Sequence, residues 1–216
     1  MKKVADQMEQ DRFATEQETF WAGEFGTSYI ARNQGDRLLA ANLDLFAKAL
    51  RQTGGVSNCL EFGANVGMNM KALGLLFPGI DASAVEINDE AVQQLVNVIP
   101  AENIHHQSIL DYVPSRTFDL TLIKGVLIHM SPDVLPQVYD TLVAATARYL
   151  LVAEYYDPAP VALPYRGHEG RLFKRDFAGE IMDRHPTMRL RDYGFVYHRD
   201  PLFPQDDITW FLLEKR

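Results

Sequence analysis

The sequence contains one cysteine, Cys59, so no disulfide can form within a single chain. It is also poor in basic residues, because 21 Lys and Arg stand against 29 Asp and Glu and give a formal net charge of −8. Proteins that bind nucleic acid or anionic membranes normally carry an excess of Lys and Arg, so this charge argues against both kinds of partner. No apolar run approaches the roughly 20 residues of a membrane span, and the first residues lack the apolar core of a signal peptide. These absences predict a cytoplasmic protein whose cysteine is a buried structural thiol.

Motifs of two other enzyme classes are missing as well. The zinc-binding string H-E-x-x-H is absent, and neither His168-Glu169 nor His105-His106 has partners at metal-ligand spacing. We therefore expect no metal site. The string G-x-S-x-G is also absent, so the sequence does not support the nucleophile elbow of a hydrolase.

What the sequence does contain is the composition of a folded domain, since 47% of its 216 residues are hydrophobic and 11% aromatic. Between residues 53 and 156, short apolar runs alternate with helical segments, which predicts βαβ units and a mostly parallel sheet. Residues 190–199 and 208–215 are strand-like and are joined only by a loop, so they should pair antiparallel. We predict a doubly wound α/β fold with a seven-stranded, mostly parallel, Rossmann-like sheet that ends in an antiparallel hairpin. The predicted strands are 56–62, 80–87, 104–109, 118–123, 149–156 and the two of the hairpin.

Segments of a different character flank the predicted core, and we expect all of them to belong to one domain. The N-terminal part has a polar helix, then a stretch around 21–33 that is typical of a lid or pocket wall, then a helix over 36–51 that Asp36 would cap. The segment after the fifth strand is longer than a usual connection, which indicates a functional loop. The resulting division is a helical cap at 1–52, a core at 53–156, a substrate loop at 157–189 and the hairpin at 190–216.

The most informative motif is the turn after the first predicted strand, which reads Glu61-Phe62-Gly63-Ala64-Asn65-Val66-Gly67. Its glycines allow a sharp bend and the close approach of a ligand, and the helix that follows offers free N–H groups. A dinucleotide needs G-x-G-x-x-G, and only Gly63 matches one of those glycines. The pattern for S-adenosylmethionine (SAM), E/D-x-G-x-G-x-G, is matched everywhere except at Asn65. The turn therefore favours SAM, whose ammonium group Glu61 would bind directly or through water.

Polar residues also follow the second and third predicted strands. Glu86, with Ile87 beside it, lies close to the spacing of roughly 20 residues after Gly63 at which a carboxylate binds ribose hydroxyls. Ser108 and Ile109 follow the third strand, where adenine would lie. Ile109 would pack on the ring face and Ser108 would bind the amino group.

The fourth predicted strand leads into Lys124, Gly125 and His129, at the edge of the sheet where open α/β folds bind ligands. Lys124 and Gly125 would contact SAM through backbone atoms, and His129 would face the methyl acceptor. Each of these motifs also has a purely structural interpretation: a tight turn without a ligand, a solvated strand end or a hydrogen-bonded buried histidine.

Taken together, these motifs resemble the class I SAM-dependent methyltransferases over about residues 56–154. Three longer strings narrow the resemblance to the pseudaminic-acid-biosynthesis-associated methylases. These strings are TEQETFWAGEFGTSYIARN, EYYDPAPVALPYRGHEGRLFKRDFAGE and YGFVYHRDPLFPQDDITWFLLEK. The resemblance implies SAM as cofactor, the class I methyltransferase fold and a link to surface-glycan sugar pathways, but it does not identify the acceptor.

Several residues are candidates for binding the acceptor. Methyl transfer from a sulfonium needs mainly alignment, and the sequence does not decide whether a hydroxyl or amine acceptor also needs a base. The candidate catalytic residues are His129, His168 and Tyr156. A basic run from 165 to 175 has two interpretations. It is a solvated loop with surface ion pairs, or it binds an anionic sugar or phosphorylated metabolite, since Arg binds such groups through two hydrogen bonds. The candidate substrate-binding residues are Tyr29, Arg32, Asn33, Tyr155, Arg166, Lys174, Arg175, His198 and Arg199.

The sequence therefore predicts a SAM-dependent methyltransferase that acts on an oxygen or nitrogen of a small molecule. A binding protein that keeps the SAM fold without turnover is a second interpretation. An NAD-dependent oxidoreductase is a third, which the incomplete dinucleotide motif disfavours. The acceptor and the oligomeric state do not follow from the sequence.

Overall fold

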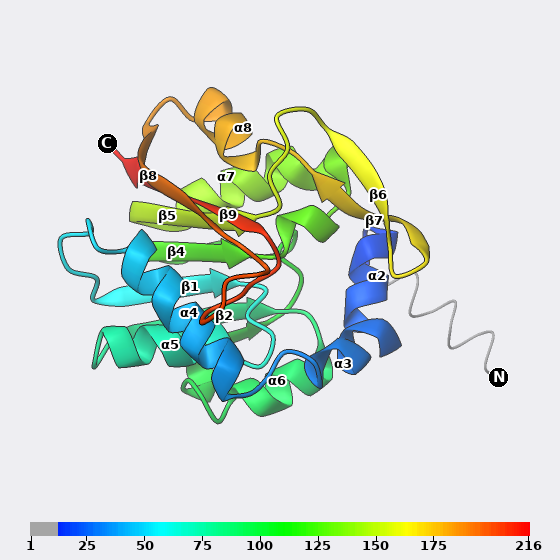
Figure 1. Cartoon of the computed structure of the whole chain (residues 1–216), viewed down its shortest axis with the longest axis horizontal. Helices are drawn as coiled ribbons and strands as arrows, with labels where there is room; N and C mark the ends of the chain where they lie inside the picture. The colour runs from blue at the N-terminus through cyan, green and yellow to red at the C-terminus, as the bar shows by residue number, and fades with distance from the viewer. Residues whose placement is uncertain (1–12) are drawn as a thin grey trace.

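A computed structural model describes residues 13–216, and the first part of the predicted cap, residues 1–12, lies outside the described residues. The described chain forms a seven-stranded sheet with helices on both faces and a separate two-stranded sheet (Figure 1). The strand order is β3-β2-β1-β4-β5-β9-β8. The first five strands are parallel to their neighbours, whereas β9 pairs antiparallel with β5 and β8. The predicted fold class is therefore confirmed. The strands are β1 Asn58–Phe62, β2 Asp81–Glu86, β3 Ile104–His106, β4 Phe118–Lys124, β5 Thr146–Glu154, β8 Met188–Val196 and β9 Ile208–Lys215.

Helices bury the sheet from both sides. On one face, α4, α5 and α6 form a core around Phe46 and Leu73, while α7 and α8 pack on the other face around Leu142 and Ile181 (Figure 1). Both faces of the central strands are thus covered, which explains why β1 and β4 read as almost continuous apolar runs. The helices are α4 Asp36–Ala49, α5 Met68–Leu76, α6 Asp89–Leu95, α7 Leu135–Ala145 and α8 Phe177–Arg184.

The predicted polar helix ends in α2 (Glu16–Ala22), and the stretch predicted as a lid or pocket wall, around 21–33, contains the short helix α3 (Glu24–Ile30). Thr15 and Glu18 form a capping box, in which each side chain accepts a hydrogen bond from the backbone N–H of the other, and this fixes the start of α2. Further along, Gly35 rather than the predicted Asp36 occupies the N-cap of α4.

The predicted substrate loop is more ordered than its sequence suggests. It contains the hairpin of β6 (Val161–Tyr165) and β7 (His168–Lys174), followed by α8. Pro164 and the glycines of this segment interrupt the alternation typical of a strand, which is why the hairpin was not predicted. Figure 1 shows β7 lying beside α2. Gln17 of α2 donates to the carbonyl of Gly170 in the hairpin. The hairpin, α2 and α3 together are called the cap.

Candidate functional site

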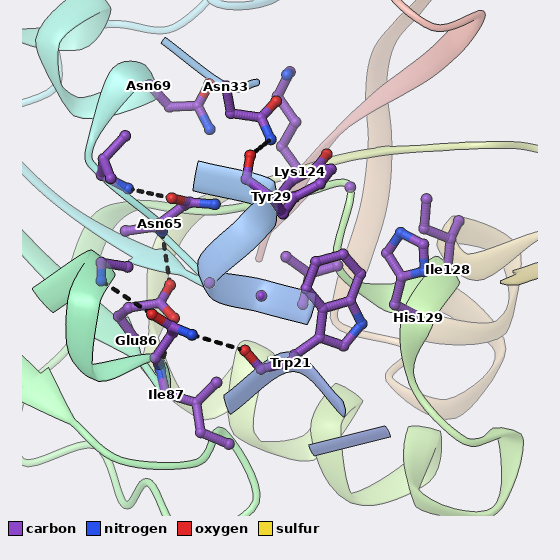
Figure 2. Close-up of a pocket in the computed structure, with 18 of the residues that line it drawn as sticks. Trp21, Tyr29, Asn33, Asn65, Asn69, Glu86, Ile87, Lys124, Ile128 and His129 are labelled. Atoms are coloured by element: carbon purple, nitrogen blue, oxygen red, sulfur yellow. Dashed lines mark hydrogen bonds between the residues drawn. The ribbon is translucent and has the colours of Figure 1, made fainter. Parts of the chain in front are cut away.

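A cavity of about 410 Å³ lies at the carboxyl ends of β1, β2 and β4, beneath the cap (Figure 2). The strand order changes direction at β1, because β2 lies on one side of it and β4 on the other. In open α/β sheets, ligands bind in the crevice at such a point. The cavity is therefore where this fold places a binding site.

The turn after β1 is shaped by its glycines. Gly63, Asn65 and Gly67 have φ angles of +73°, +48° and +80°, a region that glycine adopts readily and other residues rarely. A Cβ atom on Gly63 would lie 2.5 Å from Cγ2 of Val126, and one on Gly67 would lie 2.7 Å from Cδ1 of Leu95. Both glycines are thus required by conformation and by space.

Glu86 lies at the end of β2 and connects two segments of the cavity wall, the turn after β1 and the residues that follow β2. One of its carboxylate oxygens accepts the N–H of Asn65 at 2.7 Å, and the other accepts those of Ile87 and Asn88 at 2.9 and 2.8 Å (Figure 2). Burial raises the pKa of Glu86, although the three N–H donors oppose that shift. A carboxylate offers about four acceptor positions, so Glu86 keeps acceptor capacity that faces the cavity.

Glu61 is fully buried next to the cavity. Its Oε1 accepts a hydrogen bond from the side chain of Asn69, which lines the cavity, whereas its Oε2 is buried and has no partner among the described residues. Burial raises the pKa of Glu61 to about 8, and Asn69 and Lys124 oppose that shift. An unpartnered buried carboxylate oxygen is costly, and a cationic ligand group would satisfy it.

The backbone after β4 is held by a residue that the sequence analysis did not identify. Glu154, at the end of β5, accepts the N–H groups of Val126 and Leu127 at 2.9 and 3.0 Å and that of Ile128 at 3.5 Å. Burial raises the pKa of Glu154 to about 7. These bonds fix the loop that carries Gly125, which has a φ of +67°.

His129 follows this loop and is 6% exposed. Its Nδ1 lies 2.6 Å from the carbonyl oxygen of Arg171, which only accepts, so Nδ1 carries the hydrogen. Burial lowers the pKa of His129 to about 4. Its ring is flanked by the ring of Trp21 (Figure 2) and by that of Tyr165, each with its centroid 4.7 Å away. The ring is therefore neutral at ordinary pH, and its Nε2 is an acceptor.

The structure brings most of the predicted cofactor residues together. Of that set, Glu61 and Gly67 do not line the cavity, and Glu61 lies behind Asn69. Ser108 lines the cavity, but it donates its hydroxyl to Glu18 of α2 and accepts the N–H of Leu110. The residues of the set that line the cavity are Gly63, Asn65, Glu86, Ile87, Ser108, Ile109, Lys124 and Gly125.

Of the predicted catalytic residues, only His129 lines the cavity. His168 is exposed and packs against Phe20 and Phe25 on the cap surface. Tyr156 is 41% exposed and contacts Phe211 of β9. It directly follows Tyr155, which lines the cavity, and successive side chains of an extended chain point to opposite sides.

The predicted acceptor residues are divided in the same way. Those of the N-terminal cap line the cavity with Tyr155, whereas much of the basic run faces elsewhere. Arg175 pairs with Glu180 at 2.7 Å, and His198 pairs with Asp207 at 2.8 Å. The predicted residues that line the cavity are Tyr29, Arg32, Asn33 and Tyr155, and those that do not are Arg166, Lys174, Arg175, His198 and Arg199.

Several cavity residues were not predicted because distant segments bring them in. Asn88 is 4% exposed, and its Nδ2 donates to the carbonyls of Trp21 and Ala22 and to the hydroxyl of Thr27. It thereby attaches the cap to the end of β2. No local pattern could reveal contacts across more than 60 residues. The unpredicted lining residues include Glu18, Trp21, Asn42, Asn69, Asn88, Tyr165, Gln205 and Asp206.

Among residues 13–216, no group of three or more His, Cys, Asp and Glu side chains is arranged to hold a metal ion. No helix in the same range is long and apolar enough to cross a membrane.

No protein-family model matches the sequence, and no curated protein sequence matches it either. Solved structures, by contrast, share its fold. A SAM-dependent methyltransferase of Leishmania major superimposes with a TM-score of 0.68 at 14% identity, covering 98% of this chain and 90% of that one. The 1,6-didemethyltoxoflavin-N1-methyltransferase of Burkholderia thailandensis, solved with its acceptor and S-adenosylhomocysteine, gives 0.67 at 16% identity, with 99% and 89% covered.

The mitomycin 7-O-methyltransferase gives a TM-score of 0.66 at 14% identity. That match covers 94% of this chain, which spans only 61% of the longer enzyme. At such identities the likeness establishes the fold, and that fold is the one used by class I SAM-dependent methyltransferases.

Proposed function

We propose that this protein is a SAM-dependent methyltransferase that methylates an oxygen or nitrogen of a small molecule. One observation carries the proposal. A single cavity joins the glycine turn, with the unpartnered oxygen of Glu61 close behind it, to Glu86 at the end of the next strand. This arrangement matches a ligand that has an ammonium group at one end and a ribose further along.

The residues present fit SAM. Glu61, which Asn69 separates from the cavity, would bind the ammonium group through water, while Glu86 would accept a ribose hydroxyl at its one remaining acceptor position. Ile87 and Ile109 supply apolar surface for adenine. Bound SAM supplies an electrophilic methyl group on a sulfonium sulfur.

His129 is the residue of this chain best placed to assist the acceptor. Because Nδ1 is committed to the Arg171 carbonyl, Nε2 can accept a hydrogen bond from an acceptor O–H or N–H and so orient the acceptor. The rings of Trp21 and Tyr165 hold the imidazole in this orientation. Tyr29 and Tyr155 line the same cavity and would orient the acceptor.

Two arginines support an anionic acceptor. Arg32 lines the cavity and lies over the ring of Tyr29 at 5.5 Å. Arg166 does not line the cavity, but it lies at 5.7 Å over the ring of Tyr165, which does. Neither guanidinium has a carboxylate within 4.0 Å among the described residues, so both are available to a phosphate or carboxylate of the acceptor. A sugar-pathway acceptor and a cytoplasmic location remain proposals supported by the sequence alone.

A methyl-transfer assay tests the proposed activity. SAM would be incubated with the protein and with sugar phosphates, nucleotide-linked sugars and their dephosphorylated counterparts, and S-adenosylhomocysteine (SAH) formation would be measured. Acceptor-dependent SAH formation is expected. SAM binding without SAH formation on any acceptor would favour a non-catalytic binding protein, and binding of NAD instead of SAM would favour an oxidoreductase.

Arg32→Ala and Arg166→Ala should each raise the KM for an anionic acceptor about 10-fold while changing kcat little, because they remove binding at a distance from the reacting atoms. The preference for the phosphorylated over the dephosphorylated acceptor should fall in parallel. Steady-state kinetics with both acceptors would measure this. Arg175→Ala is the matched control, since that guanidinium is already paired with Glu180 and is not available to the acceptor. Equal effects of all three substitutions would count against an anion site at the mouth of the cavity.

The protonation state of His129 gives a second expected result. Burial lowers its pKa to about 4, so the neutral imidazole should dominate above about pH 5 and be lost only as the pH falls through 4. Nitrogen-15 spectra of the labelled protein should show a neutral ring with its hydrogen on Nδ1 between pH 6 and 8, with His129→Asn identifying the signal. A ring that titrates between pH 6 and 7 would contradict this assignment.

A further inference from the structure

Glu18 of α2 reaches the end of the cavity where the base of a bound nucleoside would lie. Glu18 is only 8% exposed, and it lines the cavity together with Ser108 and Ile109. Its Oε1 accepts the hydroxyl of Ser108, and its Oε2 accepts the N–H and hydroxyl of Thr15 at 2.9 and 3.0 Å. Glu18 therefore places a carboxylate from the cap against the core of the sheet.

The register of the sheet places this carboxylate relative to the ribose. Glu86 of β2 pairs with His106 of β3, and Ser108 lies two residues beyond that pair. A nucleoside whose ribose hydroxyls bind Glu86 must therefore direct its base over the residues that follow β3, which the first turn of α2 covers. Ile109 supplies one wall of this space, and Glu18 supplies the charged acceptor.

The hydrogen bonds of Ser108 decide which of the two side chains recognises the base. Ser108 donates its single hydroxyl hydrogen to Glu18 and accepts the N–H of Leu110 at 3.0 Å. Glu18 carries three hydrogen bonds, which leaves one of about four acceptor positions, on Oε1. Hydrogen bonds to a carboxylate are roughly twice as strong as those to a neutral hydroxyl.

We propose that Glu18 accepts a hydrogen bond from the exocyclic amino group of the cofactor's adenine, so that a cap residue selects the base. This inference rests on the proposed function, because it assumes that the cavity holds an adenosyl ligand. It also implies that the cofactor site is complete only when α2 is docked. The three bonds from Asn88 to the cap hold it in that position.

A comparison of two ligands tests the proposal. SAH carries the amino group, whereas in S-inosylhomocysteine a carbonyl oxygen replaces it and the neighbouring ring nitrogen carries a hydrogen. Calorimetry with the full chain should show that the wild type prefers SAH by at least about 10-fold, since an unmade bond to a buried carboxylate is costly. In Glu18→Gln that preference should fall to within about 3-fold, because a side-chain amide can donate to the carbonyl oxygen.

The substitution is designed to preserve the fold. Gln supports a capping box as Glu does, so α2 should keep its N-terminus, and the melting temperature would check this. Glu24→Gln, an exposed position at the start of α3, is the control and should keep the wild-type preference. If Glu18→Gln bound both ligands more weakly by the same factor, the proposal would be overturned and Glu18 would be a purely structural contact. A wild type that binds SAH without preferring it would also overturn it, while a wild type that binds neither ligand would refute the cofactor assignment itself.

Discussion

Gly63→Ala is expected to weaken the binding of SAH at least about 100-fold. Two physical effects add at this position. A non-glycine residue at a φ of +73° costs about 1–2 kcal/mol, and its Cβ would lie 2.5 Å from Cγ2 of Val126. Val126 is β-branched and its N–H is bound to Glu154, so it has little freedom to move away. Overpacking of this kind costs about a further 1–3 kcal/mol.

Chemical denaturation should therefore show Gly63→Ala to be less stable by about 2–5 kcal/mol, and calorimetry should show at least a 100-fold weaker affinity for SAH. Gly79→Ala is the matched control. Gly79 also has a positive φ, +85°, but a Cβ there would have no atom within 4 Å. The Gly79→Ala variant should therefore lose only the stability that the positive φ costs a non-glycine residue, and its affinity for SAH should equal that of the wild type. An equal loss of affinity in the two variants would show that Gly63 has no special place in the site.

Glu86→Gln should produce the second-largest effect. The variant keeps the shape of the side chain, but one oxygen becomes an NH2 group that either faces the N–H of Asn65 or replaces the acceptor of Ile87 and Asn88. It also removes a charged acceptor for ribose hydroxyls, and hydrogen bonds to charged groups contribute about 1.5–3 kcal/mol each. We expect SAH to bind at least 100-fold more weakly, as calorimetry would measure.

Asp89→Asn serves as the control for Glu86→Gln. Asp89 lies three residues away, its side chain is 66% exposed, and its ion pair with His106 at 2.8 Å lies on the surface. Removing that charge should leave the affinity for SAH within about 2-fold of the wild-type value, since exposed ion pairs contribute about 1 kcal/mol to stability at most. If Glu86→Gln bound SAH as the wild type does, Glu86 would have no role in holding the ribose.

The core of this fold could be predicted because its signals are local. The alternation of strands and helices identified the mostly parallel sheet, and the motif around Gly63 together with Glu86 identified the wall of the cavity. Both kinds of signal lie within one βαβ unit. Backbone bends that need glycine and carboxylates at strand ends leave a trace in a few adjacent residues.

The cap could not be predicted in the same way, because distant parts of the chain form its contacts. Glu18 meets Ser108 across 90 residues, and Asn88 meets Trp21 across 67. In the basic run a local signal was present but misleading, because its composition suggested a binding loop. Its fold into a hairpin and an ion pair leaves Lys174 and Arg175 outside the cavity lining.

Titration of the purified protein with SAH in buffers of different ionisation enthalpy tests the central claim most directly. Burial raises the pKa of Glu61 to about 8, so this carboxyl is mostly protonated at pH 7 in the free protein. An ammonium group placed against it favours the ionised form. We predict one-to-one binding with release of close to one proton at pH 7, and loss of that release in Glu61→Gln. No binding of SAH at millimolar concentration, or tight binding that Glu61→Gln leaves unchanged in affinity and in proton release, would contradict the account.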